Sequence, residues 1–324
     1  MAITLAQAKV GMADKVDQAV IDEFRRESFI LDRLTFDNAV SPGTGGSTLT
    51  YGYLKLKTPS VAAGRAINAE YTPGEAVKEE CTAKVKIMGG SFQVDRVLED
   101  TAAKSEIAFQ LSEKVKATRN LFHYLFINGN ATSDSTQFDG LDVQVKDTST
   151  EVTPDSAIDL TTSANIASNG PVLVEKLHYM MSLMAEKPDV LLMNGRMKAI
   201  LQTIGYNLGY YSRVEDSFGR QVDTFDGVPM IDMGKYYNGE ATVDSIGNDE
   251  NGCTSIYAVK LGLNGVHGIS PVGNKVVKTY LPNMSEPGAV KTGEVELLAG
   301  VVVKNSLLAG ALRNIKIVTP TISA

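Results

Sequence analysis

A long amphipathic segment, residues 99–127, constrains the fold of this chain more than any other feature of its sequence. Apolar side chains recur there at steps of three, four and seven residues, with Lys and Glu between them: Ile107, Leu111, Val115, Phe122, Leu125 and Phe126. Residues 128–130 (Asn-Gly-Asn) end the pattern. A helix of ~28 residues would be ~42 Å long at 1.5 Å per residue. Because the mean helix has only about 11 to 12 residues, the segment predicts one long supporting helix.

The N-terminal region predicts elements that lie against something else. Residues 5–36 carry apolar side chains at roughly helical intervals, with acidic and basic residues between them, and predict one or two amphipathic helices. The glycine-rich segment 41–47 then interrupts the regular structure.

Residues 48–57 and 81–97 alternate apolar and polar side chains and predict the two arms of a long β-hairpin. We expect a bulge or bend at Gly89-Gly90, with four apolar residues on one face: Val85, Ile87, Phe92 and Val94. About two dozen residues with little apolar content separate the arms. A two-stranded element of this kind is marginal alone, so it is either flexible or lies on a neighbouring molecule.

The remainder of the chain predicts a mixed α/β region with long closing strands. Short strands are expected around residues 143–152, and Val, Leu and Ile dominate closing strands over residues 294–318. Residues 166–287 alternate helices and strands, which is typical of an α/β domain. We expect a helix from Pro171 to before Pro188, a buried strand at 189–194, a helix at 196–204, a turn and strand at 225–232, and a strand at 254–261.

Composition excludes several classes of function. The 324 residues carry 31 Lys and Arg against 38 Asp and Glu, a net charge of −7, which argues against a strong nucleic-acid binder. Cys81 and Cys253 lie far apart outside any C-x-x-C motif, which indicates a reducing cytoplasm without disulfides. The N-terminus lacks the order of a signal peptide. Apolar runs such as 297–303 are too short to cross a bilayer. We therefore expect a soluble chain with no membrane partner.

No pattern in the chain assigns chemistry. The three histidines, His123, His178 and His267, lack metal-binding spacing and are interpreted as packing or surface residues. Residues 43–48 lack the lysine of a phosphate-binding loop. The acidic segment 244–252 lacks the EF-hand positions. We predict no catalytic, cofactor-binding or metal residues, no cofactor, and no enzyme activity. An α/β enzyme with a dispersed site is the alternative from another class.

Taken in order, these elements resemble the major capsid proteins of tailed bacteriophages, the Hong Kong ninety-seven phage-type shell family that also includes the encapsulins. Four segments carry the resemblance: the helix end at 126–130, Phe-Asp-Gly-Leu at 138–141, Phe-Asp-Gly-Val-Pro-Met at 225–230, and the closing segment 299–317. The resemblance covers nearly the whole chain.

The resemblance implies an α+β class and the phage major capsid protein fold, with an N-terminal arm, an extended β-hairpin loop, a long spine helix in a peripheral domain, and an α/β axial domain. The corresponding parts are the arm at 1–40, the hairpin loop and its base at 41–98, the peripheral domain with the spine helix at 99–165, the axial domain at 166–287, and the closing strands of the peripheral domain at 288–324.

The resemblance also implies a function. The chain would assemble with itself, as hexamers and pentamers, into an icosahedral shell that encloses a double-stranded DNA genome without sequence-specific binding. It would then be found in the virion after assembly in the host cytoplasm, with portal, scaffolding and decoration proteins as further partners. Scaffolding is expected from a separate protein. Lys55 and Lys57 lie in the hairpin, but nothing nearby identifies an Asn partner or an activating Glu for a covalent cross-link. An encapsulin-type compartment is the alternative within the same fold.

Overall fold

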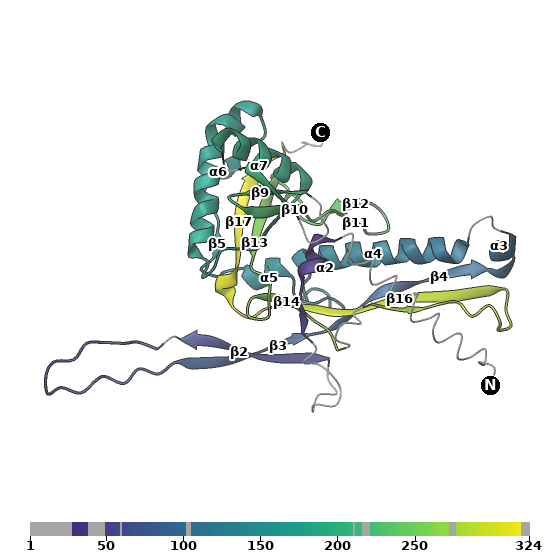
Figure 1. Cartoon of the computed structure of the whole chain (residues 1–324), viewed down its shortest axis with the longest axis horizontal. Helices are drawn as coiled ribbons and strands as arrows, with labels where there is room; N and C mark the ends of the chain where they lie inside the picture. Colours follow the sequence, from purple (N-terminus) through teal and green to yellow (C-terminus); the bar gives the residue numbers. More distant parts are fainter. Residues whose placement is uncertain are drawn as a thin grey trace.

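The structure, a computed structural model, describes residues 28–37, 49–58, 60–101, 105–209, 211–215, 221–271 and 277–318. The predicted helical segment before residue 28 and the glycine-rich segment 41–47 lie outside the described residues. Figure 1 shows three parts: a long sheet with a helix along it, an α/β unit above one end of this sheet, and a two-stranded arm that extends away from the same end. No helix among these residues combines the length and apolar character needed to cross a membrane.

The long sheet is organised around one strand. It consists of β1 (Phe36–Asp37), β14 (Val266–Ile269), β16 (Val290–Val303) and β15 (Val277–Tyr280) in that order, with β4 (Lys86–Asp95) also paired to β16. Strand β4 runs antiparallel to β16 in an unbroken register from Val290 opposite Asp95 to Ala299 opposite Lys86. Two segments about 200 residues apart in the sequence therefore form the longest ladder of the described structure.

Helix α4 (Glu106–Asn128) lies along this sheet (Figure 1). Its 23 residues span about 34 Å at 1.5 Å per residue. The predicted apolar stripe points inward, because Leu111, Val115, Phe122, Leu125 and Phe126 are buried against β4 and β16. The helix begins later than predicted. Ser105 accepts a hydrogen bond from the Ala108 amide and caps it, while a separate short helix, α3 (Arg96–Thr101), precedes it.

The α/β unit contains an eight-stranded sheet with two helices on one face. The strand order is β5 (Glu151–Val152), β17 (Ala309–Lys316), β13 (Cys253–Val259), β7 (Val190–Met193), β10 (Val228–Asp232), β9 (Gln221–Phe225) and β8 (Tyr211–Glu215), with β6 (Ile158–Asp159) also on β17. The covering helices are α6 (Ser163–Leu183) and α7 (Gly195–Leu208).

The central strands of this sheet join two hydrophobic cores. On β7, Leu191 and Met193 pack beneath α6 and α7, whereas Val190 and Leu192 face the core that contains α4. The period of two along a strand sends neighbouring side chains to opposite faces, so a strand buried on both faces is apolar throughout. The predicted buried strand at 189–194 is confirmed. The short helices α2 (Phe29–Arg33) and α5 (Leu141–Val145) add to the core around α4.

Several expected elements differ from the observed ones. The predicted strand 81–97 is split at buried Val85: β3 (Val77–Lys84) pairs with β2 (Thr50–Thr58), and β4 pairs with β16. No bulge interrupts β4 at Gly89-Gly90, so alternation continues through them, and Met88 is buried while Ile87 is 61% exposed. Residues 141–145 form a helix where a strand was expected.

Three boundaries also differ. Helix α6 begins eight residues before Pro171, because the Thr162 side chain caps it by accepting from the Asn165 amide. Helix α7 extends to Leu208 and is capped by Asn194. Within the segment 288–324, which was expected to close the unit around the long helix, β17 pairs with β13 in the eight-stranded sheet. The remaining elements are the hairpin β11 (Lys235–Tyr237) and β12 (Thr242–Asp244), and η1 (Ser306–Leu308).

Candidate assembly surface

The arm formed by β2 and β3 extends from the body along the long axis of the molecule (Figure 1). The register runs from Thr50 opposite Lys84 to Thr58 opposite Val77. The described residues between the strands, 60–76, form no helix or strand and are all exposed. A turn near Asn68, which has a positive φ of 66°, reverses the chain. The body of the subunit therefore leaves residues 60–76 uncovered.

The arm carries apolar side chains that face solvent. We define the arm surface as six residues with their exposed fractions: Leu54 64%, Leu56 62%, Val61 75%, Ile67 91%, Tyr71 63% and Val77 47%. Single exposed apolar residues are ordinary, but six of them on one protrusion that its own subunit leaves uncovered indicate an interaction site. Burying a Leu or Val side chain contributes about 1.5–3 kcal/mol, so a partner that covers this surface would gain substantial free energy.

The root of the arm, by contrast, is packed onto the long sheet. Tyr51 and Val85 form a small buried cluster with Ile269 of β14 and Val302 of β16. The Tyr51 hydroxyl donates to Asp37 Oδ2 at 3.0 Å. Burial, together with Asp37, raises the pKa of Tyr51. The sequence predicts a hairpin here, but its alternation alone does not separate the anchored root from the exposed part.

Lys55 and Lys57, which the resemblance connects with covalent cross-linking, both belong to β2. The Lys55 Nζ lies 5.6 Å from the centroid of the Tyr53 ring, a cation–π distance. The side chain of Lys57 lies outside the described residues. No cross-link is predicted at either lysine, because the sequence near them identifies neither an Asn partner nor an activating Glu.

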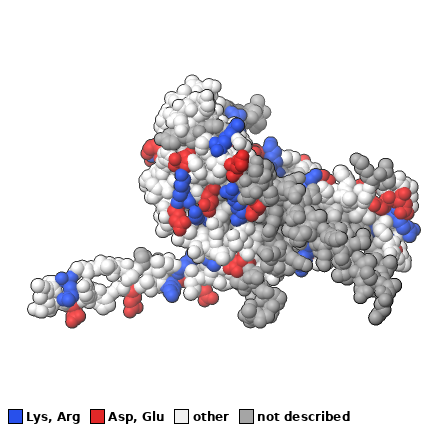
Figure 2. All heavy atoms as spheres, viewed as in Figure 1, with Lys and Arg blue, Asp and Glu red and all other residues white. Residues whose placement is uncertain are grey.

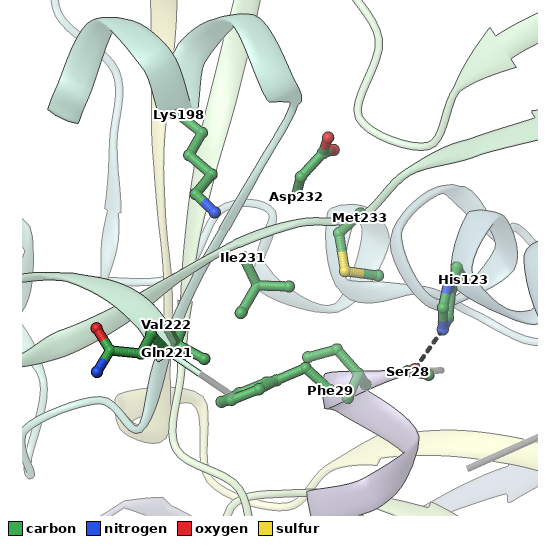
Figure 3. Close-up of a pocket in the computed structure, with 10 residues that line it drawn as sticks. Ser28, Phe29, His123, Lys198, Gln221, Val222, Ile231, Asp232 and Met233 are labelled. Carbon is green, nitrogen blue, oxygen red and sulfur yellow. Dashed lines mark hydrogen bonds between the residues drawn. The ribbon is translucent and has the colours of Figure 1, made fainter. Parts of the chain in front are cut away.

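A pocket of about 310 Å³ lies where α2 meets α4, α7 and β10; Figure 3 shows the residues that line it. His123 of α4 and Ser28 lie on one side of it, with Nε2 and Oγ 2.7 Å apart. Lys198 of α7 and Asp232 of β10 lie on the other, and Phe29, Ile231 and Met233 supply apolar walls. Burial and the nearby Arg119 lower the pKa of His123, so the imidazole is neutral at pH 7.

The Ser28–His123 contact has the spacing of a nucleophile and its base, but its surroundings indicate a structural role. Ser28 is 2% exposed, and its Oγ accepts from the Leu31 amide, so it caps α2. Its hydroxyl proton is then available to His123. Lys198 Nζ lies 3.4 Å from Asp223 Oδ2 in an ion pair. The hydrogen bond between Ser28 and His123 joins α2 to α4 across 95 residues of sequence.

The other singled-out residues are not brought together. His178 packs near the Phe225 ring, with centroids 5.6 Å apart, and His267 is buried in β14. In the loop at 244–252, the Asp249 carboxylate accepts from the amides of Asn251 and Cys253, as turn residues do. Over the described part of the chain, no three His, Cys, Asp or Glu residues gather as metal ligands would. Segment 43–48 lies outside it.

Charges of both signs are interspersed on the visible face of the α/β unit, and much of the visible arm carries neither (Figure 2). A surface of this kind gives no continuous basic footprint for a phosphate backbone on that face. The arm surface is therefore the feature of the described structure that most clearly requires a partner, and the chemistry it offers is apolar contact.

Solved shells of phages and encapsulins share this architecture. The holo-SrpI encapsulin complex of Synechococcus elongatus matches with a TM-score of 0.59 at 16% identity, over 91% of this chain and 90% of that one. The capsid of Myoviridae phage XM1 matches at 0.56 and 12% identity, over 89% and 91%. A virus-like particle from Pyrococcus furiosus matches at 0.54 and 13% identity, over 93% and 99%.

No protein-family model and no curated protein sequence matches the chain. The likeness is therefore one of fold, and it extends over nearly the full length of both partners in each comparison. The predicted fold class is confirmed: the chain has the Hong Kong ninety-seven phage-type capsid fold that phage capsids and encapsulins share.

Proposed function

We propose that this chain is a shell-forming structural protein, the major capsid protein of a tailed phage. The observation that carries the proposal is the arm surface: an extended hairpin exposes apolar residues such as Ile67 and Leu54 that its own subunit does not cover. Copies of the same chain are the natural partners, since a heterologous contact between different surfaces of one chain forms a ring when the rotation between copies closes. The capsid fold supports the same conclusion.

In this proposal the arm and the long sheet with α4 form the contacts between neighbouring subunits, and the α/β unit packs around the symmetry axes of hexamers and pentamers. Portal, scaffolding and decoration proteins would complete the head, and the virion would be the final location. The interior would hold double-stranded DNA without base-specific contacts, which agrees with the net charge of −7.

Negative-stain electron microscopy of the expressed chain tests the proposal. Closed particles tens of nanometres across, or rings of capsomer size, are expected, with or without co-expressed scaffolding and portal proteins. Only small monodisperse particles at high concentration, in the presence of those head proteins as well, would refute it.

An encapsulin-type compartment is a second candidate, favoured by the match to the SrpI encapsulin at a TM-score of 0.59. The two candidates differ in what the particle contains and in which genes lie beside this one. Genes for a portal and a large terminase beside this one, and DNA inside particles made in the native host, support the capsid. A neighbouring gene for a cargo enzyme, and particles filled with that protein, support the compartment instead.

A further inference from the structure

His267 occupies an unusual position beneath the root of the arm. It lies in β14 with no exposed surface, and neither ring nitrogen has a hydrogen-bond partner among the described residues. Buried polar atoms are nearly always paired. Its ring packs edge-to-face with the ring of Tyr51, with centroids 5.9 Å apart and planes at 75°. A titratable side chain without a partner therefore sits directly against the residue that anchors the arm.

The charged and titratable groups around His267 come from each neighbouring element. Asp37 of β1 accepts from the Tyr51 hydroxyl, and Lys304, which follows β16, has its Nζ 4.0 Å from the same carboxylate. That ammonium also lies 5.3 Å from the Tyr51 ring centroid. The carbonyl of Gly265 accepts from the Lys304 amide. The Asp37 carboxylate is thus shared between Tyr51 and Lys304, and the Lys304 ammonium would repel a second positive charge on the imidazole.

We infer that His267 is an acid-sensitive contact for the arm: protonation of its imidazole separates Tyr51 from the long sheet and frees the root of β2 and β3. A buried imidazolium beside the Lys304 ammonium is strongly unfavourable, because burial and that ammonium outweigh the opposing effects of Gly265 and Asp37. The subunit relieves it by admitting water between Tyr51 and His267. The cluster of Tyr51, Val85, Ile269 and Val302 opens with it, because Tyr51 belongs to both.

The same geometry determines whether the contact between Tyr51 and His267 is favoured at high or at low pH. Burial, and then Lys304, lower the pKa of His267 below 6.5, while Gly265 and Asp37 partly oppose the change. The pKa of His267 is lower when the arm root is packed on the long sheet than when it is free. His267 therefore favours the packed root at pH values above its ordinary pKa, and this contribution is lost progressively as the pH falls below about 6.5. The arm is therefore held at neutral pH and released in mild acid.

Hydrogen–deuterium exchange of the unassembled full chain tests this inference. Protection of peptides that cover residues 49–56 and 80–85 is measured at pH 7.5 and 5.5, corrected for the intrinsic exchange rate at each pH, with β7 as the internal reference. We expect the protection of the root to fall about tenfold at pH 5.5, one unit below the ordinary pKa of histidine. Carboxylates ordinarily titrate below pH 5.5, so they should contribute little to a change between pH 7.5 and 5.5. The measurement concerns the single subunit, so it stands whether or not the chain forms shells.

Two variants test whether His267 causes the loss of protection at low pH. His267→Gln keeps a neutral side chain of similar size and should remove the loss of protection at low pH. His123→Gln, which changes a histidine of α4 instead, should leave that loss intact. Equal protection of the wild-type root at both pH values, or a loss that persists in H267Q, overturns the inference. If H267Q does not fold, carbon-13 labelling of histidine in the wild-type chain decides, since the His267 resonance must titrate over the pH range in which the root loosens. A resonance that titrates elsewhere counts equally against the inference.

Discussion

Gly89 of β4 passes so close to Val295 of β16 that a Cβ atom at Gly89 would lie 2.0 Å from the Val295 carbonyl oxygen. The clashing atom belongs to the backbone, so no change of side-chain rotamer can relieve the clash. The φ of Gly89, 151°, is also one that residues with a Cβ rarely adopt. The longest ladder of the described structure therefore depends on a glycine at this position.

Gly89→Ala should lower the free energy of unfolding of the unassembled subunit by about 2 kcal/mol, within the range for forced backbone shifts in a packed structure. Urea unfolding monitored by circular dichroism measures it. Gly64→Ala is the matched control, because no atom lies within 4 Å of a Cβ there, and its effect should stay within about 0.5 kcal/mol. Equal stability of G89A and wild type would contradict the close approach.

The beginning of α4 depends on two side chains that satisfy its free amides. Ser105 Oγ accepts from the Ala108 amide at 3.2 Å, and Glu99 accepts from the Ile107 amide at 3.0 Å and from the Ser105 hydroxyl at 2.7 Å. Ser105→Ala should cost about 1 kcal/mol, as loss of an N-cap does. Ser105→Thr keeps the hydroxyl and should recover most of it. Chemical denaturation of both variants makes the comparison.

The same contacts give a pH dependence. The hydrogen bonds from Ser105 and the Ile107 amide lower the pKa of Glu99. The stabilisation they provide is present above the ordinary value of 4.5 and is lost as the pH falls through the lowered value. In S105A this acid-dependent loss should be smaller than in the wild type, which denaturation series between pH 3 and 6 would reveal. An unchanged pH profile in S105A would exclude the link between the two residues.

The sequence predicts the elements whose pattern is local. The apolar stripe from Leu111 to Phe126 has the helical period and needs no partner to be recognised. The buried strand β7 is identified by its composition alone. The helical period alone places the beginning of α4 too early, because Glu99 and Ser105 are compatible with a continuous helix and only their contacts show that they cap it.

Contacts between distant segments could not be predicted in this way. The split at Val85 exists because β16, about 200 residues further along, is the partner of β4. Strand β17 crosses to the eight-stranded sheet, although its composition matches that of β16. The same limit applies to the arm: alternation predicts a hairpin, but which of its apolar residues stay exposed depends on where β14 and β16 contact Tyr51.

Arg313 of β17 connects three elements near the junction of the two cores. Its guanidinium forms ion pairs with Asp142 of α5 and Glu151 of β5, and Tyr257 of β13 donates to the same Asp142 carboxylate at 2.6 Å. The arginine side chain is 22% exposed and that of Glu151 14%. Arg313→Met should destabilise the subunit by about 2 kcal/mol, less than the 3–5 kcal/mol expected for a fully buried pair, because solvent screens it in part.

Lys176→Met provides the control for this prediction. Lys176 pairs with Glu175, whose side chain is 65% exposed, and exposed pairs contribute only about 0–1 kcal/mol. Thermal unfolding of the two variants should therefore show a clear decrease in Tm for R313M and almost none for K176M. Similar decreases in both would mean that the Arg313 network contributes no more than a surface pair.

The arm surface makes the most direct prediction about assembly. Leu54 and Leu56 are 64% and 62% exposed in the subunit, so replacing both with Ser removes almost no contact within it, and the free energy of unfolding should change by less than about 0.5 kcal/mol. Between subunits the same change removes two side chains, each worth about 1.5–3 kcal/mol when buried. Repeated at every contact of a closed particle, that loss should prevent assembly.

Sedimentation velocity and negative-stain microscopy of the double variant L54S/L56S test this against a matched arm variant, Lys78→Ser, which changes a polar residue of β3 that lies opposite Leu56. The expected result is a folded, monodisperse subunit for L54S/L56S and particles for K78S. Particles of normal size from the double variant would show that the arm surface is not a contact between subunits. Unfolding of the double variant would contradict the exposure of these leucines in the subunit.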